Sequence, residues 1–180
     1  TSQIAQEILS AVKFYERHRF YFNTRVSDTF SLVANQEYYG SFDLAAIPNL
    51  ITIDDMYVTV SSVRYHVLQV PFDDIAAAQS GLIVRDPPFQ FAYYAQQIRM
   101  FPIPSSARTV TMADLYRLTA LSADSDSNAW TTDAEELIRN RAERILYSKI
   151  IKDMDAANEA AANEQEALRA LKRETRLRQA

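Results

Sequence analysis

The chain of 180 residues contains no cysteine and only two glycines. Without cysteine there can be no disulfide, no thiol nucleophile and no cysteine-ligated metal site. Loops that bind nucleotide phosphates need several glycines, because the backbone must approach the phosphate closely. Neither a P-loop nor a Gly-x-Gly-x-x-Gly motif is present. These absences exclude thiol enzymes and most nucleotide-dependent enzymes, so no cofactor is expected.

Long apolar runs and histidines are also scarce. No apolar stretch approaches the roughly 18 residues that a transmembrane helix requires, so no contact with a membrane is expected. The N-terminal residues, Thr1 to Ile4, lack the pattern of a signal peptide. The two histidines, His18 and His66, lie far apart and neither has metal-ligand spacing with acidic residues. No metal site is therefore expected.

Adjacent carboxylates are the remaining candidates for catalysis. Asp54 and Asp55 form one pair, and Asp73 and Asp74 form another. A glycosidase needs two carboxylates that flank the sugar, one of them with a raised pKa. Adjacent acids at turns and helix starts are more often capping residues, and no Gly-x-Ser-x-Gly motif is present. The sequence therefore predicts no catalytic residue and no enzyme, with a carboxylate-dependent cell-wall hydrolase as the alternative.

The hydrophobic content of 48% is sufficient for a folded core. A helix is predicted over residues 3–17, because Ile4, Ile8 and Tyr15 lie along one side. Short strands rich in β-branched and aromatic residues follow, among them a hairpin over residues 50–70. The expected fold class is α+β, in which the N-terminal helix and antiparallel hairpins pack on the root of a long C-terminal helix.

That long helix is predicted to run without interruption from Trp130 to Ala180, because neither proline nor glycine occurs after its start. Thr132 and Glu135 fit a capping box at its beginning. Isoleucine, leucine and alanine then recur at helical spacing as far as Met154. This first part is therefore predicted to pack against the rest of the protein.

The character of the helix changes near Asp155. The sequence beyond it is alanine-rich and has few residues to bury, so the helix is expected to extend as an arm. The chain is accordingly predicted to consist of a compact body, residues 1–155, and a helical C-terminal extension, residues 156–180. Deletion of the extension is expected to leave the body folded.

Charge is unevenly distributed in this part of the chain. Residues 124–136 carry five acids and no base, whereas residues 168–180 carry five bases and one acid. Acid at a helix start and base at a helix end complement the helix dipole. The basic end could also bind nucleic acid together with Arg17 and Arg19, or dock in a groove of a protein through its leucines. The leucines favour docking, and the net charge of −4 argues against nonspecific coating of DNA.

Three segments occur in a recognisable order: residues 8–23 (ILSAVKFYERHRFYFN), residues 100–104 (MFPIP) before a strand ending at residues 116–118, and residues 121–130 (LSAD to NAW) before a long helix. This order resembles the head-to-tail adaptor proteins of tailed bacteriophages, especially the short-tailed ones, over nearly the whole chain. The family has no universal catalytic residues, so none is carried over.

The resemblance implies a structural subunit in the neck of a virion, present in the host cytoplasm during assembly. It implies a ring of neighbouring copies, typically twelve, that lies beneath the portal protein and joins it to tail or nozzle proteins. Packaged DNA would pass through this ring without specific binding. The C-terminal helical segment would reach the portal, and the docking residues expected on that basis are Leu168, Arg169, Leu171, Lys172, Arg173, Arg176 and Leu177.

Overall fold

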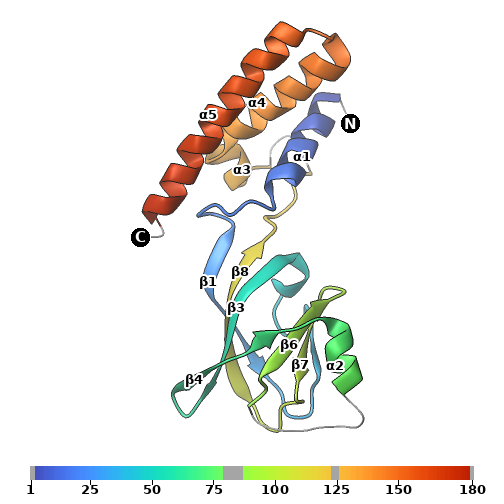
Figure 1. Ribbon diagram of the computed structural model, residues 1–180, viewed down its shortest axis with the longest axis vertical. Helices are drawn as coiled ribbons and strands as arrows, with labels where there is room; N and C mark the ends of the chain where they lie inside the picture. Colours follow the sequence, from blue (N-terminus) through green and yellow to red (C-terminus); the bar gives the residue numbers. More distant parts are fainter. Residues whose placement is uncertain (1–2, 79–86, 123–125, 179–180) are drawn as a thin grey trace. The chain divides into compact units, whose positions relative to one another are not determined.

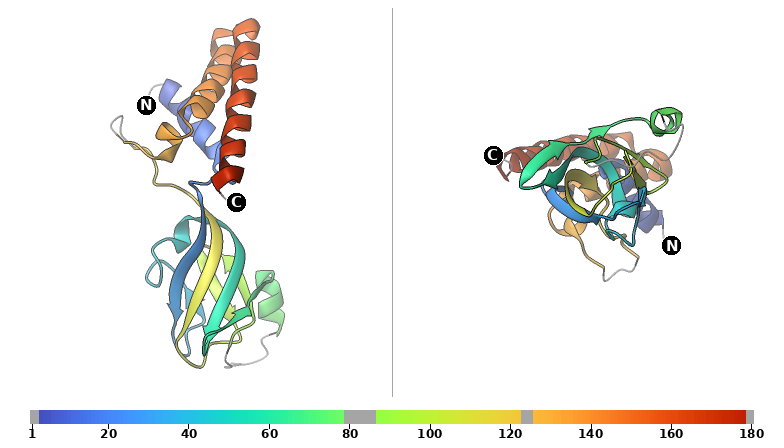
Figure 2. Two further views of the ribbon diagram at one scale, coloured as in Figure 1. Left: turned by 90° about the vertical axis from the view of Figure 1, so that its left-hand side faces the viewer. Right: turned by 90° about the horizontal axis from the view of Figure 1, so that it is seen from below.

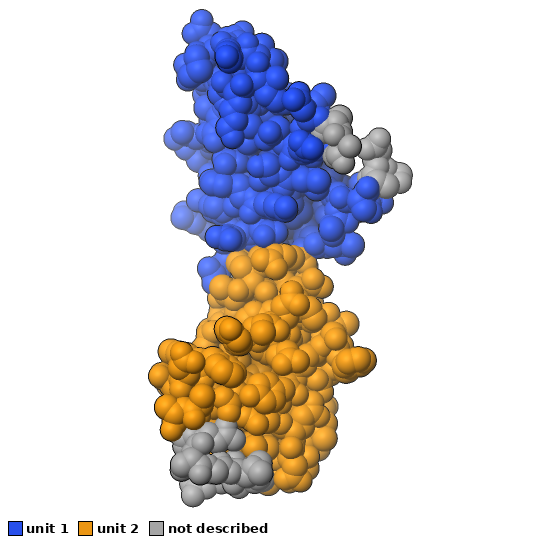
Figure 3. Space-filling model, turned by 90° about the vertical axis from the view of Figure 1, so that its right-hand side faces the viewer, with its two compact units in different colours: residues 1–23, 118–180 blue, residues 24–117 orange. Residues whose placement is uncertain are grey.

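A computed structural model describes residues 3–78, 87–122 and 126–178 of the chain (Figure 1). The chain forms two compact units, a helical unit of residues 1–23 with 118–180 and a β unit of residues 24–117 (Figure 3). The predicted α+β class is confirmed, with an N-terminal helix, antiparallel sheets and a long C-terminal helix. Within the helical unit, the first and the last helices share one hydrophobic core.

Over its described residues, the β unit contains two four-stranded sheets. The first has the order β1 (Thr24–Leu32), β8 (Arg108–Tyr116), β3 (Leu50–Val60) and β4 (Val63–His66), with antiparallel neighbours. The second has the order β2 (Tyr38–Tyr39), β7 (Gln97–Phe101), β6 (Gln90–Tyr94) and β5 (Leu68–Gln69), in which β5 and β6 run parallel. A short 3₁₀ helix, η1 (Ile47–Asn49), and a helix, α2 (Phe72–Ala78), complete the unit. The hairpin predicted over residues 50–70 is present as β3 and β4.

The core of the β unit lies between these two sheets, which face one another in Figure 2. Phe30 and Met56 of the first sheet pack in one cluster with Phe91 and Met100 of the second, and all four are almost fully buried. Alternate residues of a strand point to opposite faces of its sheet, so one face of each sheet carries these apolar side chains.

Asp114 interrupts the apolar face of β8. It follows Val110 and Met112 at alternate positions and is fully buried, and neither of its carboxylate oxygens has a hydrogen-bond partner within the described residues. Burial raises the pKa of the Asp114 carboxyl group to about 7, the Asp28 carboxylate contributes to the rise, and the Arg25 guanidinium opposes it. Below about pH 7 the folded protein therefore favours the protonated form of Asp114.

We expect the stability of the β unit to fall as the pH rises from about 4 to about 7. The folded-state pKa of Asp114 lies above its ordinary value of 3.8, so its contribution is complete below about pH 4 and is lost as the pH rises through the folded-state pKa. The loss should be roughly 1–3 kcal/mol once relaxation around the buried charge is allowed for. Urea unfolding at pH 5 and pH 8 measures it. The Asp114→Asn variant should lack this pH dependence. If the free energy of unfolding of the variant fell between pH 5 and pH 8 as much as that of the wild type, Asp114 would not be the group responsible.

The helical unit consists of α1 (Gln3–Tyr15), α3 (Ala129–Thr132), α4 (Glu135–Leu146), a π-helical turn η2 (Tyr147–Ile151) and α5 (Met154–Arg178). The prediction of one continuous helix from Trp130 is wrong, because the chain leaves the helix after α3 and again after η2. The predicted capping box at Thr132 is also wrong. Asn128 is the N-cap of α3. Its side-chain oxygen accepts a hydrogen bond from the Trp130 backbone amide, and its backbone amide donates to the Thr131 hydroxyl.

The second interruption reverses the direction of the chain. Lys152 has φ 62° and ψ 32°, the left-handed region, and the amides of Lys152 and Asp153 both donate to the carbonyl of Tyr147. The Asp153 carboxylate then accepts from the Ala156 amide at the start of α5. As a result α5 returns alongside α4, as both views show (Figures 1 and 2).

Trp130 is the centre of the helical core. Its ring meets those of Phe20 and Phe22 edge-on, with centroids 5.9 and 5.0 Å apart. Leu137 of α4 and Leu171 of α5 belong to the same buried cluster. The core of the helical unit thus joins residues from both ends of the sequence.

Candidate functional site

The long helix α5 has one buried side and one exposed side. Its buried residues are Ala157, Ala160, Glu164, Leu171 and Thr175. Their spacings of three, four or seven residues place them on one face of a helix. This face packs on α4 (Figure 2), so the described part of the extension, residues 156–178, is a member of the helical bundle and not a free arm.

A buried ionic cluster fixes α5 to the bundle. The Glu164 carboxylate accepts a hydrogen bond of 2.5 Å from the Tyr15 hydroxyl of α1. It also accepts from Arg141 of α4 at 2.9 Å and forms an ion pair with Arg144 at 3.1 Å. The Arg141 guanidinium in addition lies 3.3 Å from the centroid of the Phe14 ring. We call Tyr15, Arg141, Arg144 and Glu164 the Glu164 cluster; it joins the three long helices at one point.

The electrostatics of this cluster favour one protonation state. Burial raises the pKa of the Tyr15 hydroxyl, and its hydrogen bond to the Glu164 carboxylate raises it further. Tyr15 therefore remains a hydrogen-bond donor across the physiological range. Burial lowers the pKa of nearby His18, and the Lys172 ammonium group lowers it further, so His18 is neutral there.

The opposite side of α5 carries five of the expected docking residues. A surface depression of about 470 Å³ is lined by Arg169, Lys172, Arg173, Arg176 and Leu177. All five side chains are exposed, and Leu177 is 71% exposed. We call these five residues the basic face of α5. It combines four cations with one apolar side chain, which suits an acidic protein surface.

The other two expected docking residues belong to the core. Leu171 is only 5% exposed, and the partly buried Leu168 packs against the same cluster. Leu171 is therefore buried in the helical unit, and its expected docking to a partner stays a prediction. Because Leu171 faces α4 and Leu177 faces solvent, the two leucines should respond differently to truncation.

We expect Leu171→Ala to lower the free energy of unfolding of the helical unit by about 2–4 kcal/mol, because it leaves a cavity in a packed core. Leu177→Ala should change it by less than about 0.5 kcal/mol, as is usual at exposed positions. Trp130 is the only tryptophan of the sequence and lies in this core, so its fluorescence in urea reports on the helical unit. Equal effects of the two substitutions would contradict the placement of α5.

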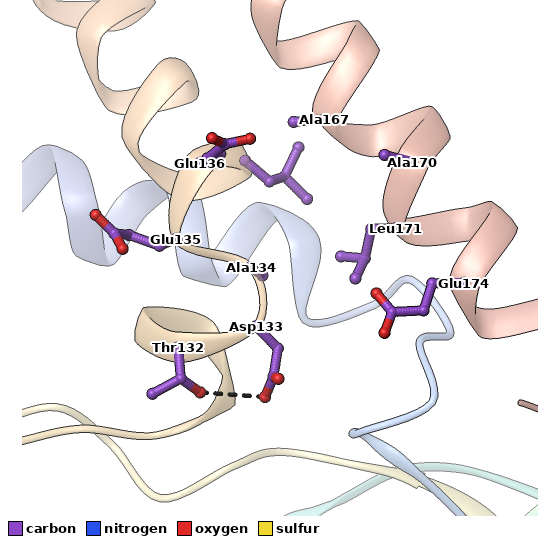
Figure 4. Close-up of a pocket in the computed structure, with 10 residues that line it drawn as sticks. Thr132, Asp133, Ala134, Glu135, Glu136, Ala167, Ala170, Leu171 and Glu174 are labelled. Carbon is purple, nitrogen blue, oxygen red and sulfur yellow. Dashed lines mark hydrogen bonds between the residues drawn. The ribbon is translucent and has the colours of Figure 1, made fainter.

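A second cavity lies between α5 and the start of α4 (Figure 4). It has a volume of about 300 Å³, and its lining includes the acidic residues Asp133, Glu135, Glu136 and Glu174. The Thr132 hydroxyl donates to the Asp133 carboxylate at 3.1 Å. Glu135 and Glu136 occupy the first turn of α4, where acids complement the helix dipole. The acidic residues of this cavity and the basic face thus lie on different sides of α5.

Among the residues considered for catalysis, Asp55 has two side-chain partners. The Asp55 carboxylate accepts from the Tyr57 hydroxyl at 2.6 Å and pairs with His66 at 2.9 Å. Asp73 and Asp74 lie in the first turn of α2. Across residues 3–78, 87–122 and 126–178, no group of three or more histidine, aspartate or glutamate side chains is arranged to hold a metal ion. None of the described helices combines the length and apolar character needed to span a membrane.

Comparison with known proteins gives one family. The family model described as SU10 adaptor protein matches residues 2–180. No curated protein matches the chain. The match includes both units and covers nearly the whole sequence.

Proposed function

Because the chain belongs to the SU10 adaptor protein family, a family of structural bacteriophage adaptors, we propose that it is a head-to-tail adaptor subunit in the neck of a short-tailed phage. In this proposal the subunits form a ring, typically of twelve copies, beneath the portal protein. Such a role requires a stable body and surfaces for neighbouring proteins, and it requires no catalytic site.

The observation that supports portal docking is the basic face of α5. Arg169, Lys172, Arg173 and Arg176 surround a depression beside the exposed Leu177, while the Glu164 cluster fixes the other side of the helix. A surface that is already ordered loses little conformational entropy on binding. We propose that this face binds an acidic surface of the portal, with Leu177 as its apolar anchor.

The ring arrangement strengthens such a contact. Every copy would present the same basic face, so modest affinity per copy is sufficient for stable attachment. Tail or nozzle proteins are the other proposed partners. The packaged DNA would pass through the ring without specific binding, in keeping with the net charge of −4.

Duplex DNA is the second candidate partner, because four exposed cations on one helix face could contact phosphates. The apolar Leu177 within the same face is better suited to a protein surface. Gel shifts at low and high salt distinguish the two candidates, since phosphate contacts weaken steeply as salt rises. A shift of duplex DNA at low salt, together with no portal binding, would favour the DNA interpretation.

Sedimentation of the purified protein with portal rings of the same phage tests the proposal. We expect the protein to sediment with the portal at a fixed stoichiometry, and an excess of unlabelled protein to displace a labelled copy. The portal alone and the protein alone are the controls. Failure to co-sediment at any ratio would contradict the proposed role.

A further inference from the structure

The helical unit has a second surface, an apolar groove between α1 and α4. It has a volume of about 430 Å³, and its apolar lining is Ile4, Ile8, Trp130, Ile138, Ala142 and Leu146. Ile4 is 60% exposed. Glu135, Arg139 and Glu143 add charged groups to the lining. None of these residues belongs to the basic face of α5, and a groove of this composition is typical of an interaction site.

The same unit has an apolar projection at the turn between α4 and α5. Ile150, Ile151 and Met154 are 42%, 61% and 59% exposed. Lys149 and Lys152 flank the two isoleucines in the sequence and are exposed. We call residues 149–154 the knuckle. It offers aliphatic side chains beside Lys149, Lys152 and Asp153, whereas the groove offers an apolar floor beside Glu135 and Glu143, with Arg139 paired to Glu135 at 3.9 Å.

The backbone of the knuckle is held in an uncommon conformation. Lys152 has φ 62°, in the left-handed region that non-glycine residues rarely adopt, because there the Cβ atom lies too close to the following carbonyl oxygen. The backbone amides of Lys152 and Asp153 donate hydrogen bonds to the Tyr147 carbonyl and hold this turn in place. Single π-helical turns such as η2 are frequent at functional sites. The knuckle is therefore ordered before any partner binds, which lowers the entropic cost of docking.

We propose that the knuckle of one copy docks in the groove of the neighbouring copy, so that this pair of surfaces is the lateral contact of the adaptor ring. Ile150 and Ile151 enter the groove, and Lys152 meets Glu143 at its edge. The two surfaces consist of different residues. Contacts between unlike surfaces generate a closed ring when the rotation from each copy to the next brings the last copy back to the first. A ring subunit needs two such lateral surfaces. The inference rests on the proposed function, because it requires a ring.

Engineered disulfides test the contact directly, because the natural sequence has no cysteine. An Ile8→Cys copy and an Ile151→Cys copy with tags of different mass are mixed, with and without portal rings, and oxidised. We expect cross-linked pairs that contain both tags. The control replaces Ile8→Cys by Ser10→Cys, an exposed position of α1 about 200° from Ile8 around the helix. Absence of the Ile8–Ile151 cross-link under both conditions, or equal cross-linking of the control, would overturn the proposal.

Charge exchange gives an independent measurement. Lys152→Glu should weaken association between copies at least tenfold, and a neighbouring Glu143→Lys copy should restore it. The portal experiment separates the two proposals. Portal binding without the cross-link rejects the lateral contact alone, whereas the cross-link without portal binding rejects portal docking alone.

Discussion

Replacement of Glu164 by alanine is expected to lower the free energy of unfolding of the helical unit by about 3–5 kcal/mol. The Glu164 side chain is 5% exposed and neutralises Arg141, whose side chain is 13% exposed. It also accepts the hydrogen bond of Tyr15. Removal of one partner from a buried ion pair leaves the other charge without compensation, and that residual charge causes most of the loss.

Urea unfolding followed by Trp130 fluorescence measures this loss. Glu166→Ala is the matched control, because Glu166 is an exposed glutamate on the same helix, and it should change stability by less than about 0.5 kcal/mol. A double variant with Glu164→Leu and Arg141→Leu should recover much of the loss, since apolar pairs often replace buried ion pairs at little cost. A loss below about 1 kcal/mol in Glu164→Ala would show that the Glu164 cluster does not fix α5.

Reversal of three charges on the basic face of α5 is expected to weaken portal binding by on the order of a hundredfold or more. The substitutions are Arg169→Glu, Arg173→Glu and Arg176→Glu. Each cation in such a contact contributes up to about 1 kcal/mol, and each reversed charge adds repulsion. All three side chains are exposed, so the fold should persist. Wild-type binding should also weaken as salt rises.

The matched control reverses the same number of charges elsewhere. Lys13, Arg17 and Arg64 are exposed and lie outside the basic face, so their replacement by glutamate changes the net charge equally. Co-sedimentation with portal rings should be retained by this control and lost by the triple variant. Equal losses would indicate that total charge, and not the basic face, controls binding.

Deletion of residues 156–180 is a less informative experiment than the sequence suggests. The deletion removes Leu171 from the core and Glu164 from its cluster, so it should expose the apolar face of α4. We therefore expect the helical unit to lose its fold. Loss of portal binding after this deletion would not separate docking from stability, whereas charge reversal does.

The features that sequence periodicity predicts are those that depend on local patterns. The first helix and the hairpin of β3 and β4 follow from regular spacing of apolar residues, and the long C-terminal helix follows from an alanine-rich sequence without proline or glycine. The reversal at Lys152 does not, because neither proline nor glycine marks it. It is stabilised by contacts distant in sequence, such as the hydrogen bond between Tyr15 and Glu164, 149 positions apart.

One signal for the packed side of α5 was present in the sequence. Ala157, Ala160, Glu164 and Leu171 share the spacing of a helix face, but small and charged residues make such a face look solvent-exposed. The burial of this face is explained by Arg141 of α4, which pairs with the Glu164 carboxylate. For the same reason the sequence could not show that Leu171 faces the core while Leu177 faces solvent.

The central claim, that α5 binds the portal through its basic face, is tested most directly by electron cryo-microscopy of the wild-type protein bound to portal rings. We expect Arg169, Arg173 and Arg176 to face acidic side chains of the portal, with Leu177 in contact and Leu171 still packed on α4. A complex in which the portal contacts only the β unit, with the basic face of α5 in solvent, would contradict the claim.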